Sequence, residues 1–169
     1  MVPVEILILP KESDDPNGLG EKIRASAENH GTEIVELDSD AKVERERLSM
    51  DIYHLSGSKE ENERCLMAML RVDKTDMLVT ADSPQRLERQ LAEQEDLSGT
   101  EILIVGHHGA KDACSKEILR EAGGMLAVVS VGYNTYGHPA EETLERLHHF
   151  GYTVMRTDLD GNVEIALGE

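Results

Sequence analysis

Short apolar runs recur along this chain, separated by polar segments that favour helices or turns. One run covers residues 4–9 and stops at Pro10, and another covers residues 32–37. Between them, apolar residues recur with helical spacing over residues 19–29, before His30-Gly31. Short apolar runs bounded by turn residues are typical of buried strands, whereas a spacing of three to four residues is typical of helices. We therefore expect a strand, a helix and a second strand in the N-terminal part.

The alternation becomes more regular towards the C-terminus. The polar pattern over residues 38–46 predicts an exposed turn or hairpin edge, and residues 56–64 a polar loop. Further strands are expected over residues 52–55, 66–72, 77–80, 102–105 and 126–131, and helices over residues 83–95, 115–121 (capped by Ser115) and 140–150. Residues 152–155 and 162–167 are expected to close the chain as a hairpin. Strands that alternate with helices predict an α/β fold, a mixed sheet with helices packed against it.

Length and composition fit one globular domain over residues 1–169. The chain is 39% hydrophobic and 30% charged, which excludes a disordered acidic tail. Aromatic residues make up only 3%, so Leu, Ile, Val, Met and Ala must form the core. No apolar run approaches the roughly 20 residues of a membrane span, and no signal peptide follows Met1. Cys65 and Cys114 could form one disulfide, but buried free thiols are expected.

The chain is strongly acidic. Its 34 acidic and 17 basic residues give a net charge of −17 at pH 7. Such a surface repels phosphate backbones at long range, which disfavours a protein that binds duplex DNA through a basic patch. A polyanionic substrate held locally by metal ions is still compatible with this charge.

Polar residues of catalytic type follow three apolar strands of the predicted sheet. They are Asp82, the pair His107-His108, and His138. Ligands of strand–helix folds bind beyond the carboxyl ends of the strands, so these groups would meet if the three strands are neighbours. Carboxylate and neutral imidazole together suit zinc, or a dinuclear manganese or iron centre.

Each of these residues also has a purely structural interpretation. Asp82 stands beside Ser83-Pro84 and could cap the next helix. Turn formation, by contrast, does not require two imidazoles between Gly106 and Gly109, so the histidine pair favours function.

The sequence alone does not decide the roles of His138 and Lys111. His138 precedes Pro139 and could equally be a helix N-cap or serve an anion at a helix N-terminus. Lys111 could pair with a phosphate or be a solvated surface lysine. The remaining histidines are expected at the surface: His30, His54, His148 and His149.

Several segments together resemble one family. They are Val-Gly-His-His-Gly-Ala-Lys at 105–111, Val-Ser-Val-Gly-Tyr-Asn-Thr-Tyr-Gly-His-Pro at 129–139, Arg-Thr-Asp at 156–158 with Asp-Gly at 160–161, and Leu-Val-Thr-Ala-Asp at 78–82. This set resembles the metallo-β-lactamase-fold hydrolases of the ComEC type, the domain attached to the competence DNA-uptake channel, and its soluble relatives. The resemblance runs from about residue 50 to the C-terminus and is strongest over residues 102–161.

The resemblance implies a four-layer αββα fold with metals, zinc or manganese, at the rim of the sheets. It implies that Asp82 bridges two metals and that His107 or His108 supplies a further ligand, with Asp82 and His108 as the catalytic pair. Lys111, Tyr136 and His138 would lie towards the phosphate of the substrate.

The family's main metal motif, His-x-His-x-Asp-His, is absent from this sequence. The chain therefore resembles the C-terminal half of such a domain, as a fragment or as a degenerate relative, and this chain alone could hold no metal. The open sheet face of a half-sandwich would be covered by another copy, by the missing N-terminal half or by a membrane-channel portion.

Two functions are compatible with these features of the sequence. One is the C-terminal part of a metal-dependent hydrolase acting on phosphoesters, nucleic acid or nucleotide, inactive as the isolated chain. The alternative is a non-catalytic binding or assembly module that keeps the fold without its metal centre. A free-standing chain would be cytoplasmic, and a channel-linked one would lie at the outer face of the cell membrane.

Overall fold

The computed structural model describes residues 3–11, 18–55 and 65–166. The strands in these ranges are β1 (Ile6–Pro10), β2 (Glu33–Leu37), β3 (Ala41–Arg45), β4 (Leu48–Tyr53), β5 (Met67–Val72), β6 (Thr75–Val79), β7 (Thr100–Ile104), β8 (Leu126–Val129) and β9 (Thr153–Arg156). The helices are α1 (Leu19–Asn29), α2 (Gln85–Gln94), α3 (Lys116–Ala122), α4 (Glu141–His149) and α5 (Thr157–Asp160), with a 3₁₀ turn η2 (Gly106–Gly109).

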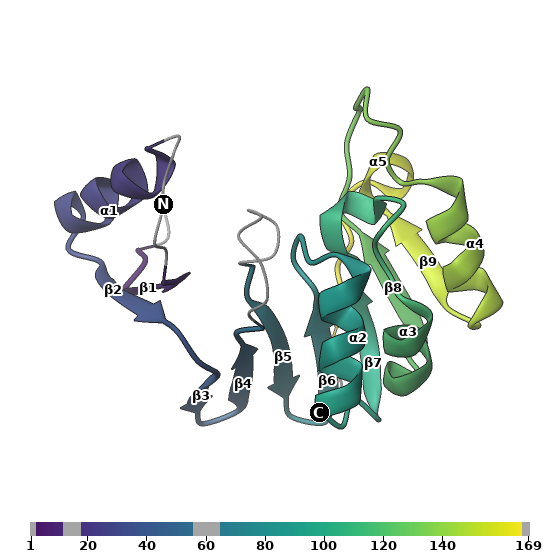
Figure 1. The fold of residues 1–169 in the computed structure, drawn as a ribbon, viewed down its shortest axis with the longest axis horizontal. Helices are drawn as coiled ribbons and strands as arrows, with labels where there is room; N and C mark the ends of the chain where they lie inside the picture. The colour runs from purple at the N-terminus through teal and green to yellow at the C-terminus, as the bar shows by residue number, and fades with distance from the viewer. Residues whose placement is uncertain (1–2, 12–17, 56–64, 167–169) are drawn as a thin grey trace.

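A mixed sheet of seven strands forms the main body. Its order is β3-β4-β5-β6-β7-β8-β9, so strands that are consecutive in sequence are neighbours in space. The pairs from β3 to β6 are antiparallel, and those from β6 to β9 are parallel. Figure 1 shows α2, α3 and α4 beside the strands of the parallel half. The predicted α/β class, with helices packed on a mixed sheet, is confirmed.

The hydrophobic core lies between one face of this sheet and the helices. The register puts Met69, Leu78, Leu103 and Ala127 in one row across β5 to β8, and all four are at most 1% exposed. The helices contribute Leu87, Leu91, Ile118, Leu119 and Leu147 to the same cluster. Aliphatic and Met side chains therefore fill the core, as the composition predicts.

A smaller unit stands apart at the N-terminus (Figure 1). β1 and β2 pair in parallel as a two-stranded sheet, and α1 connects them. The bounds of α1 match the predicted helix. Ala27 is the one residue of this unit that is buried, among its described residues 3–11 and 18–37. The unit thus has the secondary structure expected from its sequence but buries little of its apolar surface.

The predicted C-terminal hairpin is wrong. β9 pairs in parallel with β8, and α5 follows it directly, while residues 162–166 form no strand. Thr157 explains the path of the chain: its hydroxyl accepts a hydrogen bond from the N–H of Val131 at 2.8 Å and donates one to the carbonyl of the same residue at 2.7 Å. These bonds fix the end of β9 beside the end of β8.

Two smaller differences concern β4 and its surroundings. β4 begins at Leu48, four residues before the predicted strand, and forms the expected hairpin edge with β3. The predicted loop over residues 56–64 lies outside the described residues. Within the described part of the chain, no helix is both long and apolar enough to cross a membrane.

Candidate functional site

The three strands that precede the candidate residues are neighbours, as the site hypothesis requires. β6, β7 and β8 run in parallel, so their carboxyl ends lie at one edge of the sheet. The N–H of His107, after β7, donates to the carbonyl of Ala81, after β6, at 2.8 Å. This bond joins the loop that carries Asp82 to the loop that carries the histidine pair.

The histidine pair occupies a tight left-handed turn. His107, His108 and Gly109 have φ angles of 48°, 52° and 78°. A left-handed conformation costs about 1–2 kcal/mol for a residue with a side chain, and such residues concentrate at functional sites. A Cβ on Gly106 would lie 2.6 Å from the Ala81 carbonyl, and one on Gly109 would lie 2.6 Å from a carbon of Pro139. The turn therefore requires both glycines.

The two imidazoles of the pair contact different groups. The ring of His107 lies 5.6 Å from that of His138, centroid to centroid. His108 is more exposed, and its Nδ1 lies 2.7 Å from the carbonyl of Ser130 at the end of β8. A carbonyl only accepts, so Nδ1 of His108 carries the hydrogen and the neutral ring keeps a lone pair on Nε2. In that arrangement Nε2 of the imidazole can serve as a metal ligand.

His138 does not cap α4. The N-cap of that helix is Ala140, which leaves His138 in the preceding loop, before a cis peptide bond to Pro139. Its ring stacks on Tyr136 with centroids 6.1 Å apart and planes 19° apart. Nδ1 of His138 is buried and has no hydrogen-bond partner among the described residues. A buried polar atom without a partner is costly, so a polar group bound here would remove an existing penalty.

Lys111 lies near this loop but is already engaged. Its ammonium group is 2.7 Å from a carboxylate oxygen of Glu142, and the two side chains are 75% and 49% exposed. The same contact lowers the pKa of the Glu142 carboxyl. An ion pair this exposed is weak because water screens it, so Lys111 can exchange this partner for another anion.

Asp82 is exposed and does not cap α2. Pro84 is the N-cap of that helix and no side chain caps it, so the capping interpretation is wrong. Cys65 lies close to Asp82, since burial first and the Asp82 charge second raise the pKa of its thiol to about 11. The thiol is therefore protonated at neutral pH.

Two residues that the sequence did not reveal fix the segment after the histidine pair. Glu88 of α2 is buried and accepts hydrogen bonds from the N–H groups of Cys114, at 3.0 Å, and Ser115. Burial raises the pKa of this carboxyl to about 7. From α4, the guanidinium of Arg146 donates to carbonyls on the other side of the segment, those of Lys111, Ala113 and Cys114, at 2.7–3.0 Å. The segment is thus held from two helices.

The described residues do not form a complete metal centre. Asp82, His107 and His108 have suitable chemistry, but no group of three or more His, Cys, Asp or Glu side chains within residues 3–11, 18–55 and 65–166 is arranged to hold an ion. Metal ligation by these residues is thus a prediction.

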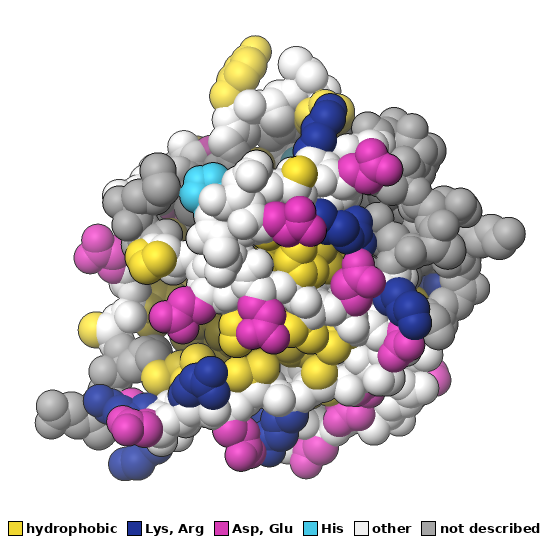
Figure 2. All heavy atoms as spheres, turned by 90° about the vertical axis from the view of Figure 1, so that its left-hand side faces the viewer, with side chains coloured by type: hydrophobic (Ala, Val, Ile, Leu, Met, Phe, Trp, Pro, Cys, Tyr) yellow, Lys and Arg dark blue, Asp and Glu magenta, His cyan; other side chains and the backbone are white. Residues whose placement is uncertain are grey.

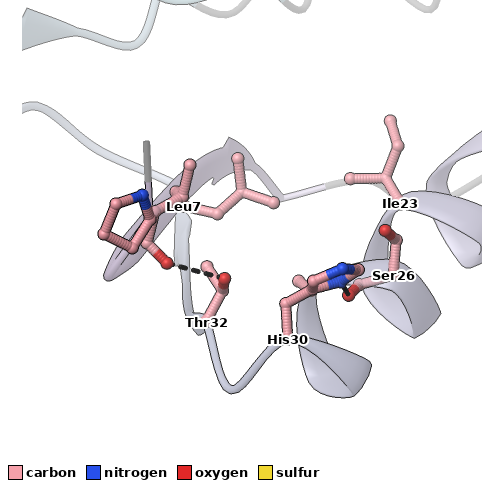
Figure 3. A pocket seen from close by; sticks show the side chains of 8 residues that line it. Leu7, Ile23, Ser26, His30 and Thr32 are labelled. Carbon is pink, nitrogen blue, oxygen red and sulfur yellow. Dashed lines mark hydrogen bonds between the residues drawn. The ribbon is translucent and has the colours of Figure 1, made fainter. Parts of the chain in front are cut away.

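A separate groove of about 610 Å³ lies in the N-terminal unit. Leu7, Ile23, Ala27 and Val4 give it an apolar lining (Figure 3). Its one titratable side chain, His30, lies with Nδ1 2.7 Å from the carbonyl of Ser26. The groove contains no set of catalytic groups and lies on the unit that stands apart from the histidine site.

Comparisons with known proteins point to one group of relatives. No protein-family model matches the chain. It is 34% identical over 94 residues to competence protein ComA of Neisseria gonorrhoeae, which covers 54% of this chain and 14% of that protein. It is 24% identical over 165 residues to ComE operon protein 3 of Bacillus subtilis, covering 95% of this chain and 21% of that protein. Recombination protein 2 of Haemophilus influenzae is 28% identical over 109 residues, covering 64% and 14%.

The chain is a homologue of the ComEC-type competence proteins. It spans about a fifth or less of the length of these relatives. Among solved structures, the fold is similar to CmlA, a diiron β-hydroxylase from Streptomyces venezuelae, with a TM-score of 0.60 and 18% identity, covering 90% of this chain and 38% of that one. A protein from Parabacteroides distasonis assigned as a metal-dependent hydrolase gives a TM-score of 0.52 and 14% identity, covering 92% and 77%. The fold is of the metallo-β-lactamase type.

Proposed function

We propose that this ComEC-like chain is the substrate-binding side of a metal-dependent hydrolase that acts on phosphoesters of nucleic acid or nucleotides. The observation that carries the proposal is the meeting of His107 and His138, with ring centroids 5.6 Å apart, beside the loop of Asp82. The relatives are competence proteins and one fold neighbour is assigned as a metal-dependent hydrolase, which supports this chemistry.

The chain's own residues are suited to hold a phosphate. The imidazoles of His107 and His138 can donate hydrogen bonds to phosphate oxygens, and Lys111 can add a charge by leaving Glu142. The Glu88 and Arg146 contacts keep the loop between Ala110 and Ser115 in place while the substrate binds.

Hydrolysis by the isolated chain is expected to be at background. Metal-bound water is the usual nucleophile for such reactions, and a dinuclear site needs more ligands than Asp82 and the histidine pair supply.

The first test is phosphate binding followed by NMR. Inorganic phosphate is expected to shift the ring signals of His107 and His138, and His138→Ala is expected to abolish the shift at His107. His30 is the matched control because it lies in the N-terminal unit and its Nδ1 contacts the Ser26 carbonyl. Equal shifts at His30, or none at His138, would contradict the proposal.

The second test is activity. With manganese or zinc, turnover of bis(p-nitrophenyl) phosphate is expected to stay at background in both wild type and Asp82→Ala. Robust turnover that Asp82→Ala abolishes would show a complete catalytic site and overturn the proposed inactivity.

A non-catalytic binding or assembly module is the second candidate. The absence of a three-ligand cluster in the described ranges favours it. Failure of phosphate to shift His138, with background turnover, would select this alternative.

A further inference from the structure

The chain has five aromatic residues, four Tyr and one Phe, and two of them are exposed on one loop. Tyr133 is 100% exposed and Tyr136 is 82% exposed. The other three behave as core residues: Tyr53 and Tyr152 are at most 5% exposed, and Phe150 packs against the core. A chain this poor in aromatic residues gains nothing for its core from two tyrosines in water, which points to a binding role.

The loop that presents these tyrosines is held in one shape by Asn134. Its amide nitrogen donates to the carbonyls of Gly132 and His138, at 2.9 and 2.8 Å. Its amide oxygen accepts from the N–H groups of Tyr136 and His138, both at 3.1 Å. The loop therefore exposes the tyrosines in a fixed conformation. Because the loop is already ordered, less conformational entropy is lost when a ligand binds the tyrosines.

The loop also borders the proposed phosphate site. In Figure 1 it extends beyond the ends of β7 and β8, between β8 and α4. The ring of Tyr136 stacks on that of His138, and His138 in turn faces His107. An unpaired nucleotide with its phosphate at the histidines would have its base, or the next one, within the reach of this loop.

We propose that Tyr133 and Tyr136 bind unpaired nucleobases by stacking. This inference rests on the proposed function and assigns it two base-binding residues. Stacking of a base on an aromatic side chain is worth about 5- to 150-fold in affinity per base, and it accepts any base because every base has a π face.

The charge of the protein favours this mode over backbone recognition. The net charge is −17, and residues 132–138 contain no Lys or Arg. Binding through counterion release is therefore small, and we expect affinity not to fall as the salt concentration rises. A duplex keeps its bases stacked inside, where the tyrosines cannot reach them.

The experiment is a binding titration in EDTA, read by fluorescence anisotropy. The probes are a labelled 12-mer of thymidylate, an abasic 12-mer with the same backbone, and a 12-base-pair duplex. We expect wild type to bind the thymidylate at least about fivefold more tightly than the other two probes. Tyr133→Ala is expected to remove this preference, and Tyr133→Phe, which keeps the ring, to retain it.

Met125→Ala is the matched control, because Met125 is 67% exposed but precedes β8 at the opposite end of the strand. Unchanged binding by this variant supports the proposal. Equal binding of thymidylate and abasic probes, no binding of thymidylate, or full retention of the preference in Tyr133→Ala would overturn it. A change in oligomeric state caused by Tyr133→Ala, without a change in thymidylate binding, would also overturn it and indicate a protein contact.

The two proposals fail in different measurements. Inorganic phosphate has no base, so its effect on His138 tests the phosphate site alone. The difference between thymidylate and abasic probes tests the tyrosines alone.

Discussion

The seven-stranded sheet and the N-terminal β1–α1–β2 unit are built from similar strands but bury them to different extents. Ile-Leu-Ile occurs in both, at residues 6–8 and at residues 102–104. In β7, Ile102 is 4% exposed and Leu103 is 0% exposed, whereas Ile6 of β1 is 44% exposed. Figure 2 shows the molecule from the side on which the N-terminal unit lies, with apolar side chains in the middle of this side and charged ones around them.

The difference in burial comes from the elements that pack against each strand and not from the sequences of the strands. β7 has a strand on each side and helices against one face, while β1 has β2 on one side and a single helix. A two-stranded sheet is marginal in water because it buries too little apolar surface. Apolar patterning thus predicts where a strand forms, and the neighbouring layer decides how much that strand stabilises the protein.

Hydrogen exchange should show the largest contrast between the two regions. The N–H of Val105 bonds to Val128 in the sheet, and that of Glu33 bonds to Glu5 in the N-terminal unit. We expect Val105 to exchange through global unfolding and Glu33 through local opening, with protection at least about a thousandfold lower at Glu33. Equal protection at the two amides would mean that the two regions unfold together.

Truncation of one apolar side chain in each region should give the next largest contrast. Leu103→Ala leaves a cavity in the core and is expected to lower the free energy of unfolding by about 2–5 kcal/mol. Ile6→Ala removes a side chain that is 44% exposed and is expected to cost under about 1 kcal/mol. Urea unfolding measures both, and a larger loss in Ile6→Ala would refute the comparison.

Glu88 should make the stability of the main body depend on pH. Burial raises its pKa from 4.5 to about 7, so between these values the folded state binds more protons than the unfolded state. Its contribution is therefore full below pH 4.5 and is lost as pH rises through 7, a fall of about 3 kcal/mol. Urea unfolding at pH 5, 6, 7 and 8 measures it. Glu88→Gln should flatten the profile, whereas Glu93→Gln, at an exposed position of α2, should leave it unchanged.

The smallest effect is expected from an ion pair of the N-terminal unit. Arg24 contacts the carboxylate of Glu36 at 2.6 Å, with side chains 29% and 41% exposed. Glu36→Gln is expected to change the free energy of unfolding by under about 1 kcal/mol, because water screens a pair this exposed. A loss above 2 kcal/mol would show that charges, and not apolar contacts, hold this unit together.

Local signals in the sequence predicted most of the fold. α1 has the predicted bounds, and Ser115 caps α3 by accepting from the N–H of Ile118 at 3.3 Å, because helix spacing and capping depend on nearby residues. The C-terminal hairpin was wrong because β9 is fixed by bonds between Thr157 and Val131, which are 26 residues apart. Pairing over such a distance leaves no local pattern.

The sequence predicted the location of the candidate site, but not its backbone conformation or all of its residues. Polar residues after three apolar strands indicated one edge of the sheet, and β6, β7 and β8 do meet there. The left-handed turn at His107 and His108 could not be inferred, because residues with side chains rarely adopt it. Nothing in the sequence indicated the role of Glu88, because it resembles any other carboxylate on a helix. Its hydrogen-bond partners lie 26 and 27 residues away in the sequence.

The outer edges of β1 and β2 affect the solubility of the protein. An unpaired strand edge is a template for association with other chains, and charges or proline at the edge oppose it. β1 ends with Pro10, while β2 carries Glu33 and Glu36 at exposed positions. At neutral pH these carboxylates and the net charge of −17 keep copies apart. The net charge, and with it this repulsion, vanishes near the isoelectric point of about 4.7. Aggregation at acidic pH should therefore begin at this two-stranded sheet.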